Sequence, residues 1–423
     1  MNEKWVVHSR SGEKYFSCIH KSGLQILIYP KTSFHSTYAV FGTKFGSIDR
    51  FFKDENGNTV VCPEGTAHFL EHKLFEGEKG SAFELYAKTG ASANAYTSFD
   101  KTCYLFSCTG NEYESLEILL DFVQSPYFTK ETIEKEQGII GQEIKMYDDD
   151  PQWRVMFNFL SSMYHNHTVK EDIAGSVESI SQITPETLYS FYNKFYNLSN
   201  MMLCVAGNIE VDKVLEMADR LLKPCEKFTD TRVLFDEPKT VVKEKVEEAL
   251  SVSLPMFEFG YKEDPSLGLD VKNVVSMEII FEVAASDCSY LFRRLLDSGL
   301  INDSSFSSEV FTGRGYAATV FSGESKDPEY VSEEIKKEIK RLKEEGFSDE
   351  EFERAKKSLY GKNIGYLNSA ECVGSALASL YYSGFELFDY IDTLADIKKQ
   401  DVLEVLKTTM NEENSVLSIV KPK

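Results

Sequence analysis

The sequence predicts an α+β fold built from two related halves. Runs typical of β-strands, such as residues 38–42 and 103–108, alternate with longer runs typical of helices, and this mixture defines the class. The chain also repeats itself: residues 183–206 align without a gap to residues 397–420, and each block reads as a helix followed by a strand. An offset close to half of the chain length favours a duplication.

The boundary between the halves is expected in a segment rich in proline and charge. Pro224 and Pro238 lie in this segment, which has little of the periodicity that forms a core. At 423 residues the chain is also too long for one ordinary core. We therefore expect an N-terminal half over residues 1–223, a linker over 224–246 and a C-terminal half over 247–423.

Composition and charge exclude several classes of protein. A hydrophobic content of 42% and a charged content of 27% are typical of a soluble globular protein, and no apolar run reaches the roughly 18 residues of a membrane span. The first residues resemble neither a signal nor a transit peptide, and the eight cysteines form no C-x-x-C pair. A cytoplasmic protein with free thiols is expected. The net charge of −22 argues against nucleic acid and permits attraction of basic peptides.

The strongest chemical signal is the pentapeptide His68-Phe69-Leu70-Glu71-His72. Two imidazoles four residues apart on a helix lie on one face, so both can reach one metal ion. Glu71 lies beside His72, where its carboxylate can act as a base towards water. The order H-x-x-E-H is that of the inverted zinc-peptidase motif. The alternative is a pair of histidines on a solvated helix, and a third ligand would distinguish the two.

A long helix is predicted from about Thr129 to just before Pro151, and it offers that third ligand. Glu136 and Glu143 are seven residues apart in it, which is nearly two full turns, so they share a face. A catalytic zinc ion takes three protein ligands, often including a carboxylate. Glu143 is the candidate ligand and Glu136 a second acid that points towards the site. Spacing alone does not separate Glu143 from a solvated surface glutamate.

Together these features resemble the pitrilysin/insulinase family of inverzincins, and most closely its short bacterial members, which are similar to processing peptidases. The resemblance rests on H-x-x-E-H, the two glutamates, the exit Asp149-Asp150-Pro151 and the segment 94–104. It implies two homologous halves, each a mostly antiparallel sheet backed by helices, and a zinc metalloendopeptidase with one Zn²⁺ per chain. The residue roles that it implies are zinc ligation by His68, His72 and Glu143, base catalysis by Glu71 and accessory acid function for Glu136.

The second half contains no histidine, so it cannot repeat the metal site. In the family, this half often carries an Arg and, seven residues later, a Tyr that hold the substrate. Aligned on Arg293, the tyrosine position holds Leu300; aligned on Gly299-Leu300, the pair becomes Leu295 and Asn302. This departure suggests the catalytic member of a heterodimer whose homologous partner supplies substrate-binding groups. A homodimer is the alternative.

The peptide is expected to add as a strand beside residues 92–95, because strand addition supplies backbone hydrogen bonds for many sequences. Asn94 and Ala95 are therefore candidate substrate-binding residues, and the family resemblance implies Arg293 as a third. The rival hypothesis is a non-catalytic subunit of the same fold that contains zinc and serves as a peptide-binding or scaffold protein.

Overall fold

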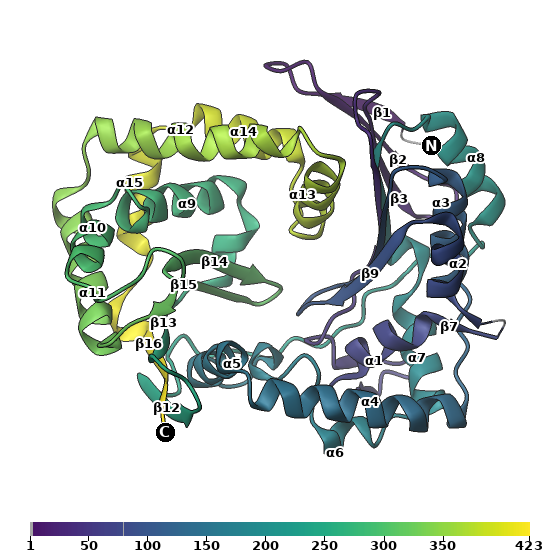
Figure 1. Ribbon diagram of the computed structural model, residues 1–423, viewed down its shortest axis with the longest axis horizontal. Helices are drawn as coiled ribbons and strands as arrows, with labels where there is room; N and C mark the ends of the chain where they lie inside the picture. Colours follow the sequence, from purple (N-terminus) through teal and green to yellow (C-terminus); the bar gives the residue numbers. More distant parts are fainter. Residues whose placement is uncertain (1–2, 79) are drawn as a thin grey trace. The chain divides into compact units, whose positions relative to one another are not determined.

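The computed structural model describes residues 3–78 and 80–423, which form two compact units (Figure 1). The first unit comprises Met1–Ile144, Asp172–Val233 and Gly365–Phe388, and the second comprises Lys145–Glu171, Leu234–Ile364 and Asp389–Lys423. Each unit contains one large sheet and several helices, so the predicted α+β class is confirmed.

The first unit is organised around a seven-stranded sheet. In spatial order its strands are β1 (Lys4–Val7), β2 (Lys14–Ile19), β3 (Gln25–Pro30), β11 (Met201–Gly207), β4 (Thr37–Thr43), β10 (Thr102–Cys108) and β9 (Ser92–Thr97). All neighbours are antiparallel except β3 and β11, which are parallel. The central strands β4 and β11 are buried along their whole length, as expected for strands covered on both faces.

Helices cover this sheet on both sides, with α3 against β10 and β4 and α13 against β11 and β4 (Figure 1). Gly374 allows the close approach of α13, because a Cβ atom there would lie 2.7 Å from the ring of Tyr38. The helices of the unit are α1 (Thr66–Leu74), α2 (Ala82–Thr89), α3 (Glu112–Phe122), most of α4 (Lys130–Asp148), α6 (Val177–Ile180), α7 (Pro185–Phe195), α8 (Val211–Leu221) and α13 (Ala370–Tyr382). Two short hairpins, β5–β6 (Phe51–Lys53, Thr59–Val61) and β7–β8 (Glu76–Gly77, Gly80–Ser81), complete it.

The second unit contains a five-stranded sheet. In spatial order its strands are β12 (Lys245–Leu250), β16 (Ser415–Pro422), β13 (Met256–Lys262), β15 (Tyr316–Glu324) and β14 (Ser307–Gly313). Helix α5 (Pro151–Met163) packs against β16 and β13, and α11 (Pro328–Glu345) contacts the same two strands. The remaining helices are α9 (Val271–Ala285), α10 (Tyr290–Asp297), most of α12 (Asp349–Tyr366), most of α14 (Leu387–Asp396) and α15 (Lys399–Thr408).

The two sheets repeat one topology. Strands β11 and β16, which the internal repeat aligns, occupy the same place: each is parallel to one neighbour, β3 or β12, and antiparallel to the other, β4 or β13. Helices α5 and α13 also correspond, since each packs on these central strands, but each comes from the other half of the sequence. Residues 145–171 and 365–388 therefore lie outside the units to which a linear division near residues 224–246 assigns them.

Two further features are the absence of a membrane-spanning helix among the described residues and the state of the cysteines. In the part of the chain that the structure describes, no helix is both long and apolar enough to cross a bilayer. The eight cysteines are free, and five of them are buried in the first unit. Free buried thiols behave as small core side chains.

Candidate metal centre

Helix α1 carries the H-x-x-E-H pentapeptide. It starts directly after Gly65, which has a positive φ of 83°. A Cβ atom at Gly65 would lie 2.3 Å from the carbonyl oxygen of Ala174, so glycine is required where the chain turns into the helix. His68 is buried, with 8% of its surface exposed. The ring centroids of His68 and His72 are 4.6 Å apart, so both imidazoles lie on one face of α1, as predicted.

Helix α4 brings Glu143 to the two imidazoles, and Figure 1 shows α1 and α4 side by side. Glu143 Oε1 lies 3.7 Å from Nε2 of His68, and Oε2 lies 3.5 Å from Nε2 of His72. One donor atom from each of the three residues lies within 4.8 Å of the others. Two imidazole nitrogens and one carboxylate oxygen are the donor set of a catalytic zinc site that keeps a position open for water or substrate. The residues present therefore fit zinc.

Glu136 lies behind His72, on the side away from Glu143. Its Oε1 is 3.0 Å from Nδ1 of His72. Although burial alone would raise it, the pKa of Glu136 is lowered by this hydrogen bond and by the charges of His72 and Lys73. An ionised carboxylate only accepts, so Nδ1 of His72 donates, which leaves Nε2 to face Glu143. Glu136 therefore positions His72 in the ligating tautomer.

A fully buried lysine, Lys73, lies beside the carboxylate of Glu136. Lys73 is 0% exposed, its Nζ lies 4.0 Å from Oε2 of Glu136, and it forms an ion pair with Glu76. A buried ammonium is tolerated only when it is paired. Lys73 therefore contacts Glu136, and Glu136 in turn contacts the candidate ligand His72.

The pKa values of the two histidines shift in opposite directions, although burial lowers both. Burial, followed by the charge of His72, lowers the pKa of His68 to about 4. His68 is therefore a neutral imidazole at neutral pH, which is the form that binds metal ions. For His72, burial lowers the pKa, but the hydrogen bond to Glu136 and the charges of Glu143 and Glu71 outweigh it and raise the pKa above its usual value.

Strand β9 holds the candidate base. The hydroxyl of Thr97 donates a hydrogen bond of 2.6 Å to Oε2 of Glu71, and the Thr97 backbone N–H also donates to that carboxylate. Burial nevertheless raises the pKa of Glu71, which makes its carboxylate a stronger base. The two hydrogen bonds from Thr97 hold the Glu71 carboxylate in place.

Thr97 is expected to position Glu71 during catalysis. Thr97→Val removes the hydroxyl at nearly constant volume, and Thr97→Ser keeps it. A hydrogen bond to a charged group contributes about 1.5–3 kcal/mol, so kcat of Thr97→Val should fall roughly tenfold to a hundredfold. KM and zinc content should stay unchanged, and Thr97→Ser should keep most of the activity. Equal kcat for both variants, measured by steady-state peptide hydrolysis, would contradict this role.

Strand β9 also forms one edge of its sheet, because within the described residues it pairs with β10 alone. The N–H of Ser98 bonds to the carbonyl of Lys101, and hydrogen-bonded pairs alternate along an antiparallel ladder. The N–H and C=O groups of Ala93, Ala95 and Thr97 therefore point away from β10. The side chain of Asn94 accepts a hydrogen bond of 2.9 Å from the Ala95 N–H, so it occupies one of these edge donors.

The second unit contains the remaining predicted residues. Arg293 is an exposed residue of α10. The two alternatives for the missing tyrosine differ in their surroundings: Leu300 is partly buried, whereas the amide nitrogen of Asn302 donates to Glu324 at 2.9 Å. The amide oxygen of Asn302 accepts from the N–H groups of Ser304 and Ser305. The side chain of Asn302 is thus engaged by Glu324 at the end of β15 and by its own loop.

Two family descriptions match this chain. Residues 62–177 match "Insulinase (Peptidase family M16)", and residues 182–359 match "Peptidase M16 inactive domain". The "Uncharacterized zinc protease YmfH" of Bacillus subtilis (strain 168) is 38% identical over 410 residues, which cover 95% of this chain and 95% of that protein. The chain belongs to peptidase family M16. The resemblance seen in the sequence is confirmed, and the insulinase match includes His68, Glu71, His72, Glu136 and Glu143.

Other similar proteins agree with this membership. An "Uncharacterized zinc protease" of Rickettsia felis (strain ATCC VR-1525 / URRWXCal2) is 30% identical, covering 90% of this chain and 92% of the relative. The crystal structure of an M16-like peptidase from Alicyclobacillus acidocaldarius superposes with a TM-score of 0.92 at 32% identity, covering 100% of this chain and 99% of that one. Pitrilysin, at 16% identity, shares the fold with a TM-score of 0.76, and this chain matches 46% of its length.

Proposed function

We propose that this M16 chain is a zinc-dependent endopeptidase that hydrolyses peptides or small unfolded polypeptides. One observation supports this most: donor atoms of His68, His72 and Glu143 lie within 4.8 Å of one another. The hydrogen-bonded carboxylate of Glu71 projects from α1, the helix that carries the two histidines. A ligand set beside a base is the arrangement that metal-assisted hydrolysis requires. We assign one zinc ion per chain to these ligands.

The protein groups have separate roles in the reaction. Bound zinc supplies a Lewis acid that polarises the scissile carbonyl and makes water acidic near neutral pH. Glu71 takes a proton from the attacking water and later passes it to the leaving amine. Thr97 holds Glu71 in place, and Glu136 holds His72 in its ligating tautomer.

We further propose that the peptide adds to the free edge of β9. The outward N–H and C=O groups of Ala93 and Ala95 can pair with an extended chain of almost any sequence. The bond from the Ala95 N–H to Asn94 covers the edge in the absence of peptide, and Asn94 would release that donor when the peptide binds. An otherwise unpaired strand edge would also be prone to association with other strands.

The partner proposal rests on the second unit. Leucine offers no hydrogen bond to a peptide, and Asn302 is engaged with Glu324 and its own loop, so neither replaces the missing tyrosine. We propose that a homologous subunit supplies substrate-binding groups in a heterodimer, with Arg293 as this chain's own contribution. A homodimer is the alternative. The non-catalytic zinc-containing subunit remains the rival function, favoured by the "inactive domain" match over residues 182–359.

Metal analysis combined with a quenched-fluorescence peptide assay tests these proposals together. The purified chain should contain about one zinc ion, and cleavage should be abolished by a chelator and restored by zinc. Cleavage should be weak for the chain alone and rise when a co-purifying homologous subunit is added. Full activity of a monomer would overturn the partner proposal only. Zinc and peptide binding without cleavage under both conditions would favour the non-catalytic subunit.

A further inference from the structure

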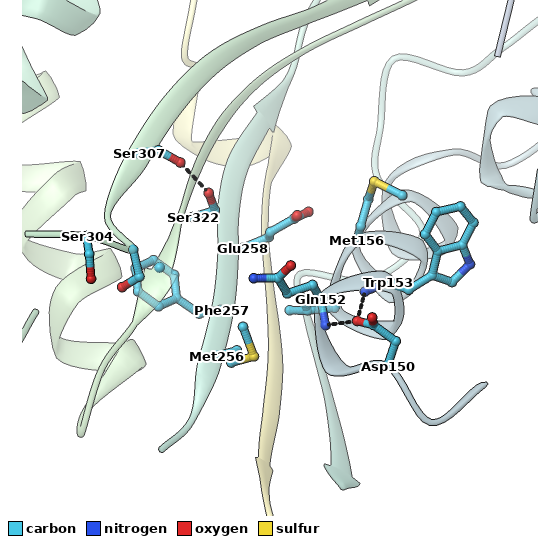
Figure 2. A pocket seen from close by; sticks show the side chains of 13 residues that line it. Asp150, Gln152, Trp153, Met156, Met256, Phe257, Glu258, Ser304, Ser307 and Ser322 are labelled. Carbon is cyan, nitrogen blue, oxygen red and sulfur yellow. Dashed lines mark hydrogen bonds between the residues drawn. The ribbon is translucent and has the colours of Figure 1, made fainter. Parts of the chain in front are cut away.

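The second unit contains a hollow of about 510 Å³ that the proposed chemistry does not use (Figure 2). It lies between the start of α5 and strands β13 and β15, with the segment before β14 closing one side. Its walls combine apolar side chains from Trp153, Met156, Met256 and Phe257 with several serines. A hollow of this size with mixed apolar and polar walls is typical of a ligand site.

The carboxylate of Glu258 is the charged group at the centre of this hollow, where Figure 2 shows it extending from β13 towards Met156. In the strand register Glu258 lies between Ser322 and Ser418. Both hydroxyls are engaged elsewhere, Ser322 with Ser307 at 2.8 Å and Ser418 with the carbonyl of Val155 at 2.9 Å. Among the described residues, no hydrogen bond or ion pair reaches the Glu258 side chain.

Among the residues that the structure describes, no lysine or arginine lines the hollow beside this carboxylate. The second lining acid, Asp150, accepts from the N–H groups of Gln152 and Trp153 at the start of α5. Burial, followed by the charge of Glu309 on β14, raises the pKa of Glu258 to about 8. Placing a carboxyl group where its charge is disfavoured costs stability unless a cation joins it.

We propose that this hollow binds the basic side chain of a peptide, with the guanidinium or ammonium group at Glu258 and the aliphatic stem against Met156 and Met256. Long basic side chains have this two-part character, an apolar stem and a charged end. The net charge of −22 would attract such peptides over a distance. Only the identification of the bound peptide as a substrate rests on the proposed peptidase function; binding itself does not.

The chain supplies its own reporter for a binding test. It has two tryptophans: Trp153 lines the hollow, and Trp5 is 45% exposed in the first unit. In a Trp5→Phe background, Trp153 fluorescence is followed while acetyl-arginine amide or acetyl-citrulline amide is added to the full chain. Citrulline has nearly the same shape and no charge. Calorimetric titration of the same pair provides a second readout that does not depend on the indole.

The arginine probe should bind at least about tenfold more tightly than the citrulline probe, as expected for a charge-assisted pair. Glu258→Gln should abolish this preference, whereas the control Glu350→Gln, which removes one charge from α12 of the same unit, should retain it. Equal affinities for the two probes, or an unchanged preference in Glu258→Gln, would overturn the proposal. Because binding is measured without cleavage, an inactive enzyme would not affect this result.

The affinity should also depend on pH in a defined direction. The cation binds the ionised carboxylate, and a pKa of about 8 leaves little of that form at pH 6.5, so affinity should rise about twentyfold between pH 6.5 and 8.5. The titratable group that acts on Glu258 from a neighbouring element is Glu309 on β14, and Asp150 at the start of α5 is the other acid that lines the hollow. A pH-independent preference for arginine would contradict the role of Glu258.

Discussion

Glu71→Gln is expected to abolish most peptide hydrolysis while leaving the zinc content unchanged. General base catalysis contributes about 10²- to 10⁴-fold, and kcat should fall by that factor because an amide cannot accept the proton from water. Glutamine can still accept the hydrogen bond that Thr97 donates to Glu71, so the surrounding structure should persist. Steady-state hydrolysis and metal analysis of the same preparation check both parts of this prediction.

The matched control is Glu134→Gln. This substitution makes the same chemical change on the surface of α4. The side chain of Glu134 is 61% exposed, and its Oε1 lies 3.8 Å from Nζ of Lys130. This variant should keep wild-type kcat, KM and zinc content. Wild-type hydrolysis by Glu71→Gln would refute its role as base. Loss of zinc from Glu71→Gln would instead show that the carboxylate holds the metal centre together.

Local patterns in the sequence predict much of the fold. The alignment of residues 183–206 with 397–420 correctly pairs β11 with β16 because each half buries its own central strand between the same neighbours. The exchange of α5 and α13 between the units could not be predicted in the same way. A helical pattern shows which face is apolar, but not which of two similar sheets it will cover.

The same limit applies to the candidate site. The spacing within α1 places His68 and His72 on one face, but Glu143 is separated from them by a long stretch of chain that only tertiary folding closes. Thr97 and Lys73 do not stand out in the sequence. An alternating pattern in residues 92–97 predicts a strand without naming its neighbour, and a lysine after His72 reads as a surface residue, whereas Lys73 is fully buried. Their roles depend on partners from other elements.

Glu143→Gln and Glu136→Gln should both weaken zinc binding, but by different amounts. The two residues lie on one face of α4, yet Glu143 approaches Nε2 of both histidines while Glu136 contacts Nδ1 of His72. Structural zinc sites with four ligands have binding free energies of about 10–16 kcal/mol, so one ligand accounts for roughly 3–4 kcal/mol. Glu143→Gln should therefore weaken zinc affinity about 10²- to 10³-fold. Loss of an outer partner such as Glu136 costs about 10- to 100-fold.

Competition with a chelator of known affinity measures both constants, and the order of the two losses is the decisive result. Glu136 lies within 4.0 Å of Lys73, so its removal also leaves a buried ammonium with one partner fewer, and thermal stability must be measured alongside. Restored hydrolysis at high zinc concentration would show that Glu136→Gln keeps the catalytic geometry. A larger zinc loss in Glu136→Gln than in Glu143→Gln would reverse the two assignments, because the ligand then would be the residue that contacts Nδ1.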